Sequence, residues 1–405
     1  MNKEERKIDL LKIIADLDIP PYLYHDACQK YEHLANYLES HGLQANIYPQ
    51  GSFALGTVIR PYSGNKERNY DFDFICQITG SRDSISPIEL RNNVLSILKE
   101  SNLYGGKLIE YPECFTIEYT PNNGLSFSID IVPATNESFS LKEELYTQSD
   151  YPWLIDTAIA IPRHSQLKVY NWLTSNPKGY CKWFFDINST FSKVSALSFR
   201  QSLFNSHRNI YDSIEQIPIE LERTSMQRVI QILKYHRDIY YSNVSNGDEL
   251  KPISAIINTI VTMISSTANP HASVFELLQY VINEISIYSH YQNLSSIDFI
   301  NKYGNRKVFT KLNGKWKIKN PANPKDNLAD KWNTNSEIPK RFFLWIKAVK
   351  DQLIDSLDLD DATFRSKAET AFGYTVVSNV WNDKYNPVKP KPISNHNPSK
   401  PWKLL

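Results

Sequence analysis

Three aspartates in two short apolar segments have the types and spacing that could carry out chemistry. Asp71 and Asp73 lie in the segment 69–76, and Asp130 lies in the segment 126–132. Side chains alternate between the two faces of a strand, so Asp71 and Asp73 share one face while the residues between them enter the core. Asp130 stands in the same alternation. If the two strands pair side by side, the three carboxylates converge on one point.

Carboxylates gathered on one face repel one another, and a divalent cation relieves that repulsion. Oxygen ligands of this kind suit Mg²⁺, with Mn²⁺ as the alternative. Two such ions, about 3.5–4 Å apart, can activate an attacking hydroxyl and stabilise the leaving phosphate of an in-line displacement. We therefore assign Asp71, Asp73 and Asp130 as candidate catalytic and metal-binding residues. Taken alone, the pattern also fits a solvated strand face without a catalytic role.

A glycine–serine turn precedes these aspartates and changes their interpretation. The segment 50–61 reads QGSFALGTVIRP. Gly51 allows the backbone to approach a phosphate closely, and Ser52 offers an N–H and a hydroxyl at the same place. The ordered set of this turn, a DFD strand and a later SID strand is specific, whereas a lone Gly-Ser pair is not. Gln50, Gly51 and Ser52 are therefore candidate nucleotide-binding residues.

The segments GSFALGTVIRP, YDFDFI and FSIDIVPA resemble the DNA polymerase β-type nucleotidyltransferase superfamily. Within it, GSxxxGT followed by an arginine is similar to the cGAS/DncV-like nucleotidyltransferases (CD-NTases) of bacterial antiphage (CBASS) systems. The resemblance covers about the first third of the chain. It implies that Gly51 and Ser52 hold a donor triphosphate and that the three aspartates bind two Mg²⁺ ions. It also implies that Asp130 helps to deprotonate the acceptor hydroxyl.

A second match lies in the segment 226–238. There Lys234 stands off the apolar stripe of a predicted helix, and Ser254 follows twenty residues later near the start of another helix, where free backbone N–H groups favour anions. The CD-NTase and animal cyclic-dinucleotide synthase families place a lysine and a serine at this spacing against the triphosphate. Lys234 and Ser254 are thus candidate nucleotide-binding residues, the alternative being a solvated lysine and a helix-capping serine. Ala255 departs from the animal pattern, which has a base-stacking aromatic residue there.

The elements that must position these residues predict an α+β protein. The first forty residues have a helical apolar pattern, and strand character follows at 45–48, 72–78, 107–119 and 125–132, around one helix at Pro87–Glu100. Strands clustered around a helix predict a polymerase β-like nucleotidyltransferase lobe with a mixed or mostly antiparallel sheet. Long helical periods at 226–241, 253–265, 274–288 and 341–357 predict a helical lobe, with the active site in the cleft between the two.

These patterns divide the chain into three parts. Residues 1–160 form the nucleotidyltransferase core with its N-terminal helices, residues 161–385 form the mainly helical lobe, and residues 386–405 form a proline-rich mobile tail. Two further segments, 175–180 and 320–330, are similar to stretches of the same families. We interpret the second as structural and the first as a turn that either anchors the fold or contacts substrate.

The bulk composition excludes several classes of protein. Hydrophobic residues make up 41% and charged residues 22% of the 405, which is typical of a globular chain. A formal net charge of +1 argues against a stable binder of long nucleic acid. The four cysteines, at positions 28, 76, 114 and 181, form no zinc or disulfide pattern. With no signal peptide or membrane span, we expect a cytoplasmic monomer.

The combined prediction is an enzyme that makes a cyclic di- or trinucleotide second messenger from nucleoside triphosphates, ATP among them, with release of pyrophosphate. One alternative is a linear RNA or tRNA nucleotidyltransferase. Another is a non-catalytic nucleotide or RNA sensor on the same fold. The family further implies antiphage signalling and CBASS accessory proteins that reach the enzyme through its C-terminal tail. The tail ends Lys403-Leu404-Leu405, without a small terminal residue, so a plain solvated tail is the other interpretation.

Overall fold

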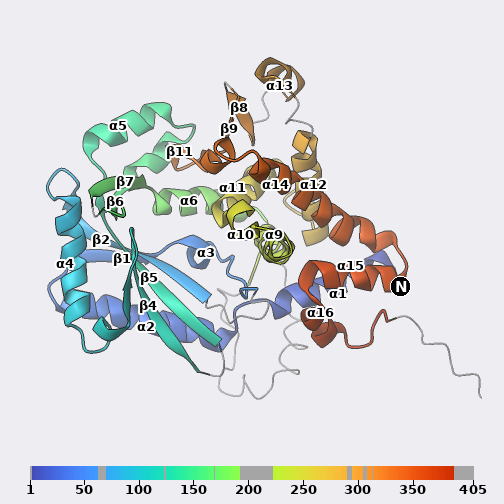
Figure 1. Ribbon diagram of the computed structural model, residues 1–405, viewed down its shortest axis with the longest axis horizontal. Helices are drawn as coiled ribbons and strands as arrows, with labels where there is room; N and C mark the ends of the chain where they lie inside the picture. Colours follow the sequence, from blue (N-terminus) through green and yellow to red (C-terminus); the bar gives the residue numbers. More distant parts are fainter. Residues whose placement is uncertain are drawn as a thin grey trace, which may run out of the picture.

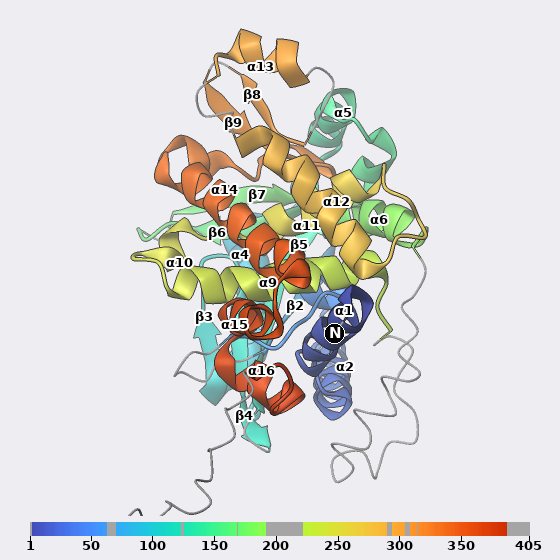
Figure 2. The same ribbon diagram turned by 90° about the vertical axis from the view of Figure 1, so that its right-hand side faces the viewer.

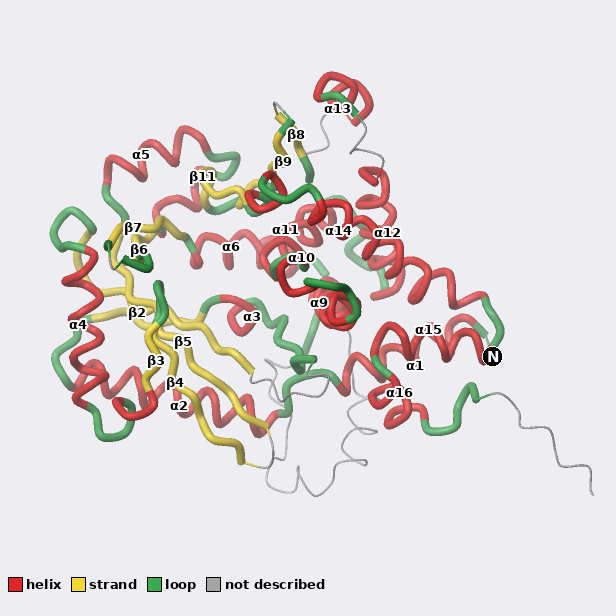
Figure 3. Tube along the Cα trace, viewed as in Figure 1, coloured by secondary structure: helices red, strands yellow, loops and turns green. Residues whose placement is uncertain are grey.

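The computed structural model describes residues 2–62, 70–122, 125–167, 169–191, 222–289, 294–303, 308–312 and 314–386. One half of the molecule is built on a sheet, and the other half consists mainly of helices (Figures 1 and 3). The predicted tail at 386–405 lies outside the described residues apart from its first residue.

The larger sheet has seven strands and one parallel pair. Its order is β1-β2-β5-β4-β3, and β6 extends it from β5 and is followed by β7. β2 and β5 run parallel, whereas the other neighbours are antiparallel, which confirms the mixed, mostly antiparallel sheet. The strands are β1 (Ala45–Pro49), β2 (Tyr70–Ser81), β3 (Leu108–Glu110), β4 (Phe115–Asn122), β5 (Leu125–Asn136), β6 (Ile159–His164) and β7 (Tyr170–Ser175). Residues 161–175, which the sequence places in the helical lobe, are therefore mostly strand.

One face of this sheet is covered by α2 (Pro21–Ser40) and α4 (Pro87–Glu100). Phe72, Phe74, Phe127 and Ile129 are all buried in the core cluster between the sheet and these helices. Because the side-chain period of a strand is two, burying these residues turns the aspartates between them to the opposite face. The alternation read from the sequence is thus the alternation in the fold.

Helix α9 (Ser225–Ser242) is the centre of the helical half. It contacts α1 (Lys3–Asp16), α10 (Gly247–Leu250), α11 (Ser254–Ser265), α12 (Val274–Ser286), α14 (Glu337–Val349) and α15 (Asp361–Phe372), and Figure 2 shows it running across the molecule between them. Every residue from Ser225 to Arg237 is buried. A helix enclosed on all sides has no solvated face, so its polar side chains must be satisfied by protein partners.

The first helix belongs to this helical half. Buried residues of α1 share a core cluster with α9, and α1 contacts α16 (Tyr374–Trp381), near the end of the described chain (Figure 2). Trp381 Nε1 donates to the backbone oxygen of Asp9 at 3.0 Å, and Tyr385 Oη donates to the Asp9 carboxylate at 2.6 Å. The two ends of the described chain are therefore joined in one packing unit.

The remaining elements cover the edges of these two halves. They include the one-turn helix α3 (Gly51–Ala54), α5 (Phe139–Gln148), α6 (Pro177–Asn188), α13 (Ser296–Tyr303), the 3₁₀ turn η2 (Pro152–Thr157), and two small sheets made of β8 (Thr310–Leu312) with β9 (Lys315–Lys317) and β10 (Lys319–Asn320) with β11 (Asn323–Asn327). No helix among the described residues is both long and apolar enough to cross a lipid bilayer.

Two predicted elements differ from the structure. The strand expected at 107–119 is two strands, β3 and β4, because the chain turns at Pro112 and the Tyr111 N–H donates to the Cys114 carbonyl at 3.0 Å. The helix expected at 341–357 begins at Glu337 and changes at Lys350 into a π turn and then a 3₁₀ turn. Periodicity predicts that an element exists better than it predicts where the element ends.

The two segments singled out as family-like loops contact each other. Asn176 caps α6 by accepting from the Gly179 N–H at 3.0 Å, and its amide donates to the carbonyls of Leu154 and Ala322. Asn323 in turn donates to the Thr174 carbonyl at 3.1 Å. These bonds fix the two segments to each other, which is consistent with the structural interpretation of 320–330.

Candidate active site

The strand register brings the three aspartates together. In the parallel pair of β2 and β5, Asp73 lies directly beside Asp130, and Asp71 lies beside Ser128. Neighbouring strands are about 4.8 Å apart, so side chains at paired positions on one face contact each other. β4 adds Thr116 next to Asp130 on the other side. The open face of three adjacent strands thus presents all three carboxylates.

Two hydroxyl groups orient two of these carboxylates. Ser128 Oγ donates to Asp71 Oδ1 at 2.7 Å, and Thr116 Oγ1 donates to Asp130 Oδ1 at 2.5 Å. Hydrogen bonds to an ionised carboxylate are stronger than those between neutral groups and hold it in one orientation. Asp73 is partly buried, and the negative charges of Asp130 and Asp71 both act on its carboxyl group.

Burial, together with the negative charges of Asp130 and Asp71, raises the pKa of the Asp73 carboxyl to about 7, against the lowering effect of Lys234. Burial also raises the pKa of Asp130, partly offset by the Thr116 hydrogen bond. A carboxyl next to like charges in a low-dielectric site holds its proton until a cation neutralises the group. The donor set therefore fits a divalent cation, which would restore ionised Asp73.

The three carboxylates do not form a complete cage. Among the described residues, no group of three or more His, Cys, Asp or Glu side chains is arranged so that it could hold a metal ion by itself. Mg²⁺ is usually bound through one or two carboxylates together with waters and substrate phosphates. The arrangement fits an ion whose coordination is completed by a phosphate group.

The glycine–serine turn lies against Asp73. The Gln50 N–H donates to the Asp73 carbonyl at 2.8 Å, and the one-turn helix α3 then begins at Gly51. Gly51 has φ of +62°, and a Cβ at this position would lie 2.5 Å from Asp73 Oδ2. Only glycine combines that conformation with that approach. The turn, with Ser52 in it, is therefore held against the Asp73 carboxylate.

Lys234 reaches the same place from α9. It is buried, its ammonium donates to the Thr57 carbonyl at 3.0 Å, and its charge acts on Asp73. Burial, with the nearby positive charge of Arg237, lowers the pKa of Lys234 to about 8. The expectation that Lys234 stands off the apolar stripe holds only in part, because α9 is buried on every side. The solvated-lysine alternative is wrong.

Ser254 is hydrogen-bonded to Arg237, whose positive charge also acts on Lys234. Ser254 is the first residue of α11, and its Oγ accepts from Arg237 Nη1 at 3.1 Å. Ile253 is the capping residue of α11 and supplies no side-chain cap, so the capping-serine alternative is also wrong. Lys234, Arg237 and Ser254 form one polar group, and within it the charge of Lys234 acts on Asp73.

The chain is similar in sequence to two bacterial cyclic dinucleotide synthases. It is 26% identical over 314 residues to the c-di-GMP synthase of Roseivirga ehrenbergii, which covers 78% of this chain and 68% of the relative. It is 22% identical over 244 residues to the cyclic dinucleotide synthase CdnG of Bradyrhizobium diazoefficiens, which covers 58% of this chain and 53% of the relative. No protein-family model matches the chain.

The fold is that of a CD-NTase of known structure. CdnG of Bradyrhizobium diazoefficiens, solved in complex with GTP, matches 93% of this chain and 98% of its own with a TM-score of 0.66 and 18% identity. The chain is therefore similar in sequence and in fold to the cGAS/DncV-like nucleotidyltransferases. The family inferred from the motifs and the polymerase β-like α+β fold are both confirmed.

Several residues at the candidate site were not identified from the sequence. Thr116 and Arg237 belong to no recognised motif, although Arg237 lies one helical turn after Lys234. Cys114 donates a hydrogen bond that lowers the pKa of Asp130, and burial raises the pKa of the Cys114 thiol to about 12. A motif search does not find such residues, because their relation to the aspartates depends on strand pairing.

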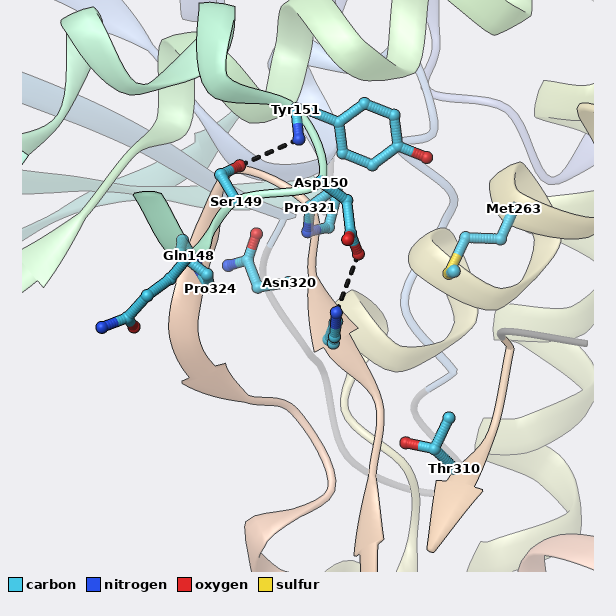
Figure 4. A pocket seen from close by; sticks show the side chains of 10 residues that line it. Gln148, Ser149, Asp150, Tyr151, Met263, Thr310, Asn320, Pro321 and Pro324 are labelled. Carbon is cyan, nitrogen blue, oxygen red and sulfur yellow. Dashed lines mark hydrogen bonds and ion pairs between the residues drawn. The ribbon is translucent and has the colours of Figure 1, made fainter. Parts of the chain in front are cut away.

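Two pockets lie outside the group of three aspartates. One of about 500 Å³ is lined by Tyr62, Lys251 and Asp238, and it adjoins the polar group because Asp238 pairs with Arg237 at 2.8 Å. Another of about 390 Å³ lies between the segment after α5 and β10, where Asp150 and Lys319 form an ion pair at 2.8 Å (Figure 4). None of the three aspartates lines either pocket.

The raised pKa of Asp73 predicts how its substitution changes stability. Its pKa is about 7 in the folded metal-free protein and near 3.8 in the unfolded chain. Ionisation therefore destabilises the fold as pH rises through this window, fully so above pH 7. We expect Asp73→Asn to stabilise the metal-free protein by roughly 1–4 kcal/mol at pH 8, and by less at pH 5.

Urea unfolding in the presence of a chelator measures this change. The control is Asp83→Asn, which removes the same charge at an exposed position after β2 and should shift the midpoint little at either pH. If Asp73→Asn raises the free energy of unfolding equally at pH 5 and pH 8, or lowers it at both, the ionised Asp73 carboxylate does not destabilise the fold.

Proposed function

We propose that this chain joins nucleoside triphosphates into a cyclic di- or trinucleotide and releases pyrophosphate. The observation that supports this best is the register that places Asp73 beside Asp130, with Gly51 and Lys234 directed at the same carboxylate. A carboxylate group, a backbone turn and a buried ammonium are the parts that a two-metal nucleotidyl transfer requires. GTP is proposed among the substrates, because the Roseivirga relative is named for c-di-GMP and CdnG was solved with GTP.

The residues of the chain divide the work of binding and orientation. Gly51 and Ser52, with Gln50 anchoring the turn to β2, hold the triphosphate close to Asp73. From the helical half, Lys234 neutralises charge on the outer phosphates and Ser254 hydrogen-bonds to them. Asp130, oriented by Thr116, accepts the proton of the attacking ribose hydroxyl. Two Mg²⁺ ions, when bound by Asp71, Asp73 and Asp130, supply the charge that stabilises the α-phosphate as it is attacked.

Partners beyond the nucleotides are a separate part of the proposal. A role in antiphage signalling with accessory proteins rests on the family alone. The tail that was expected to reach such proteins lies beyond Asn386, outside the described residues. A linear polymerase and a non-catalytic sensor remain outcomes of the test below.

The proposed reaction is tested by incubating the protein with labelled NTPs and Mg²⁺ or Mn²⁺, followed by phosphatase and mass spectrometry. We expect a phosphatase-resistant cyclic product, and Asp71→Asn should lower its rate by roughly 100-fold or more, since a preorganised charge that stabilises the transition state is lost. Asp83→Asn is the matched control and should retain the wild-type rate.

The other outcomes each point to one alternative. Label fully digested to phosphate means that no transfer occurs, as in a sensor. A ladder on added RNA means a linear polymerase. Retained synthesis with Asp71→Asn would contradict the role given to the aspartates.

The lowered pKa of Lys234 predicts an alkaline limit to nucleotide binding. Because its pKa is about 8, the free protein loses this positive charge as pH rises through 8. The affinity for a non-hydrolysable NTP analogue without metal should fall by up to about tenfold per pH unit above 8. Lys234→Met should bind the analogue weakly at all pH values, and its affinity should not fall further above pH 8. A wild-type affinity that is constant from pH 7.5 to 9.5 would contradict the contact.

A further inference from the structure

The segment that follows the Gly-Ser turn is held by three side chains of one helix. Gln227 Nε2 donates to the Leu55 carbonyl at 2.8 Å, Gln231 Nε2 donates to the Val58 carbonyl at 2.7 Å, and Lys234 Nζ donates to the Thr57 carbonyl at 3.0 Å. Positions 227, 231 and 234 are separated by four and three residues, so they lie on one face of α9. All three side chains are buried.

These bonds cross from the helical half to the catalytic strand half. The donors and acceptors are separated by 172 to 177 residues in the chain. A buried carbonyl that loses its donor keeps its full desolvation cost, so each bond constrains the segment strongly. α9 therefore fixes the position of residues 55–58, and the Thr57 N–H closes the turn by donating to the Ser52 carbonyl at 2.9 Å.

Gln231 is anchored on its own side as well. Its amide nitrogen also donates to Asp18 Oδ1 at 2.9 Å, and its amide oxygen accepts from Arg228 at 2.9 Å. Arg228 pairs with Asp18 at 2.7 Å. Every hydrogen-bonding group of the Gln231 side chain is used, so its orientation is fixed before a nucleotide binds.

The two glycines of the motif explain why the turn fits so closely. Gly51 and Gly56 both have positive φ, +62° and +65°. A Cβ on Gly51 would lie 2.5 Å from Asp73 Oδ2, and a Cβ on Gly56 would lie 2.5 Å from Gln227 Nε2. One end of the turn is therefore pressed against a catalytic carboxylate and the other against α9. The GSxxxGT spacing is the length of backbone between these two approaches.

We propose that Gln227 and Gln231 are positioning residues that hold the phosphate-binding turn against Asp73. This rests on the proposed function, since the turn is taken to bind the donor triphosphate. Neither glutamine touches substrate in this account. They act by fixing the backbone of residues 55–58, while Lys234 uses one N–H for Thr57 and directs its remaining protons toward the nucleotide. Substituting either glutamine therefore weakens nucleotide binding without removing a phosphate ligand.

A matched pair of variants separates the contact with the turn from the stability of the helix. Gln227 also belongs to the cap of α9, where its amide oxygen accepts from the Thr224 N–H at 2.9 Å. Gln227→Glu keeps this acceptor and the length of the side chain, but it places a carboxylate oxygen where Leu55 needs a donor. Thr224→Ala removes the hydroxyl that caps the Gln227 N–H and leaves the Gln227 amide on Leu55.

The measurements are the KM and kcat with GTP and Mg²⁺ and the hydrogen exchange of residues 51–58, both at temperatures where circular dichroism shows folded protein. We expect Gln227→Glu to raise KM by about tenfold or more and to speed exchange at the Thr57 N–H. Thr224→Ala should lower the melting temperature and leave KM and exchange of this segment unchanged. Gln231→Met, which is uncharged and similar in length, should behave like Gln227→Glu and replaces it if that variant does not fold.

The inference is overturned if the glutamine variants match Thr224→Ala in both KM and exchange. Hydrogen exchange needs no catalysis, so it tests the positioning directly. A wild-type protein that shows the expected protection at 51–58, but neither binds GTP nor makes product, would refute the proposed function and leave the positioning intact.

Discussion

The burial of Asp73 beside two other carboxylates is the constraint on which the candidate site depends. The only parallel pairing in the described part of the large sheet places Asp73 beside Asp130, and burial raises the pKa of Asp73 to about 7. Such an arrangement lowers the stability of the metal-free protein above neutral pH, because the unfolded chain has no such repulsion. It persists because the opposite face of the same strands is packed with Phe72, Phe127 and their neighbours. Packing on the opposite face thus offsets the unfavourable free energy of the three neighbouring carboxylates. In the proposed function, a cation and a phosphate would relieve their repulsion.

The remaining parts of the site are held by elements far apart in sequence. The turn at Gly51 is fixed to β2 through the Asp73 carbonyl and to α9 through the carbonyls of residues 55–58. Lys234 belongs to both arrangements, since it bonds the turn and lowers the pKa of Asp73. One buried helix therefore links the helical half to the carboxylates. A displacement of α9 would therefore also displace residues 55–58, which follow the glycine–serine turn.

The parts of this site that follow local rules were predictable from the sequence. The alternation in β2 and β5 placed Asp71, Asp73 and Asp130 on one face, because a strand has a period of two regardless of its surroundings. Burial of Lys234 was not predictable, because an amphipathic pattern assumes one solvated face and α9 has none. The bonds from Gln227 to Leu55 and from Thr116 to Asp130 depend on which elements meet in space. The break between β3 and β4 depended on one residue, Pro112, which interrupts the ladder.

The central claim is that Asp73 is protonated in the metal-free site and must ionise when a divalent cation binds with a nucleotide. Isothermal titration of Mg²⁺ into protein saturated with a non-hydrolysable GTP analogue, at pH 6.5 in buffers of different ionisation enthalpy, measures the protons released. The account predicts a release of up to about one proton per protein that disappears in Asp73→Asn and persists in Asp83→Asn. Metal binding without proton release, or the same release from Asp73→Asn, would contradict it.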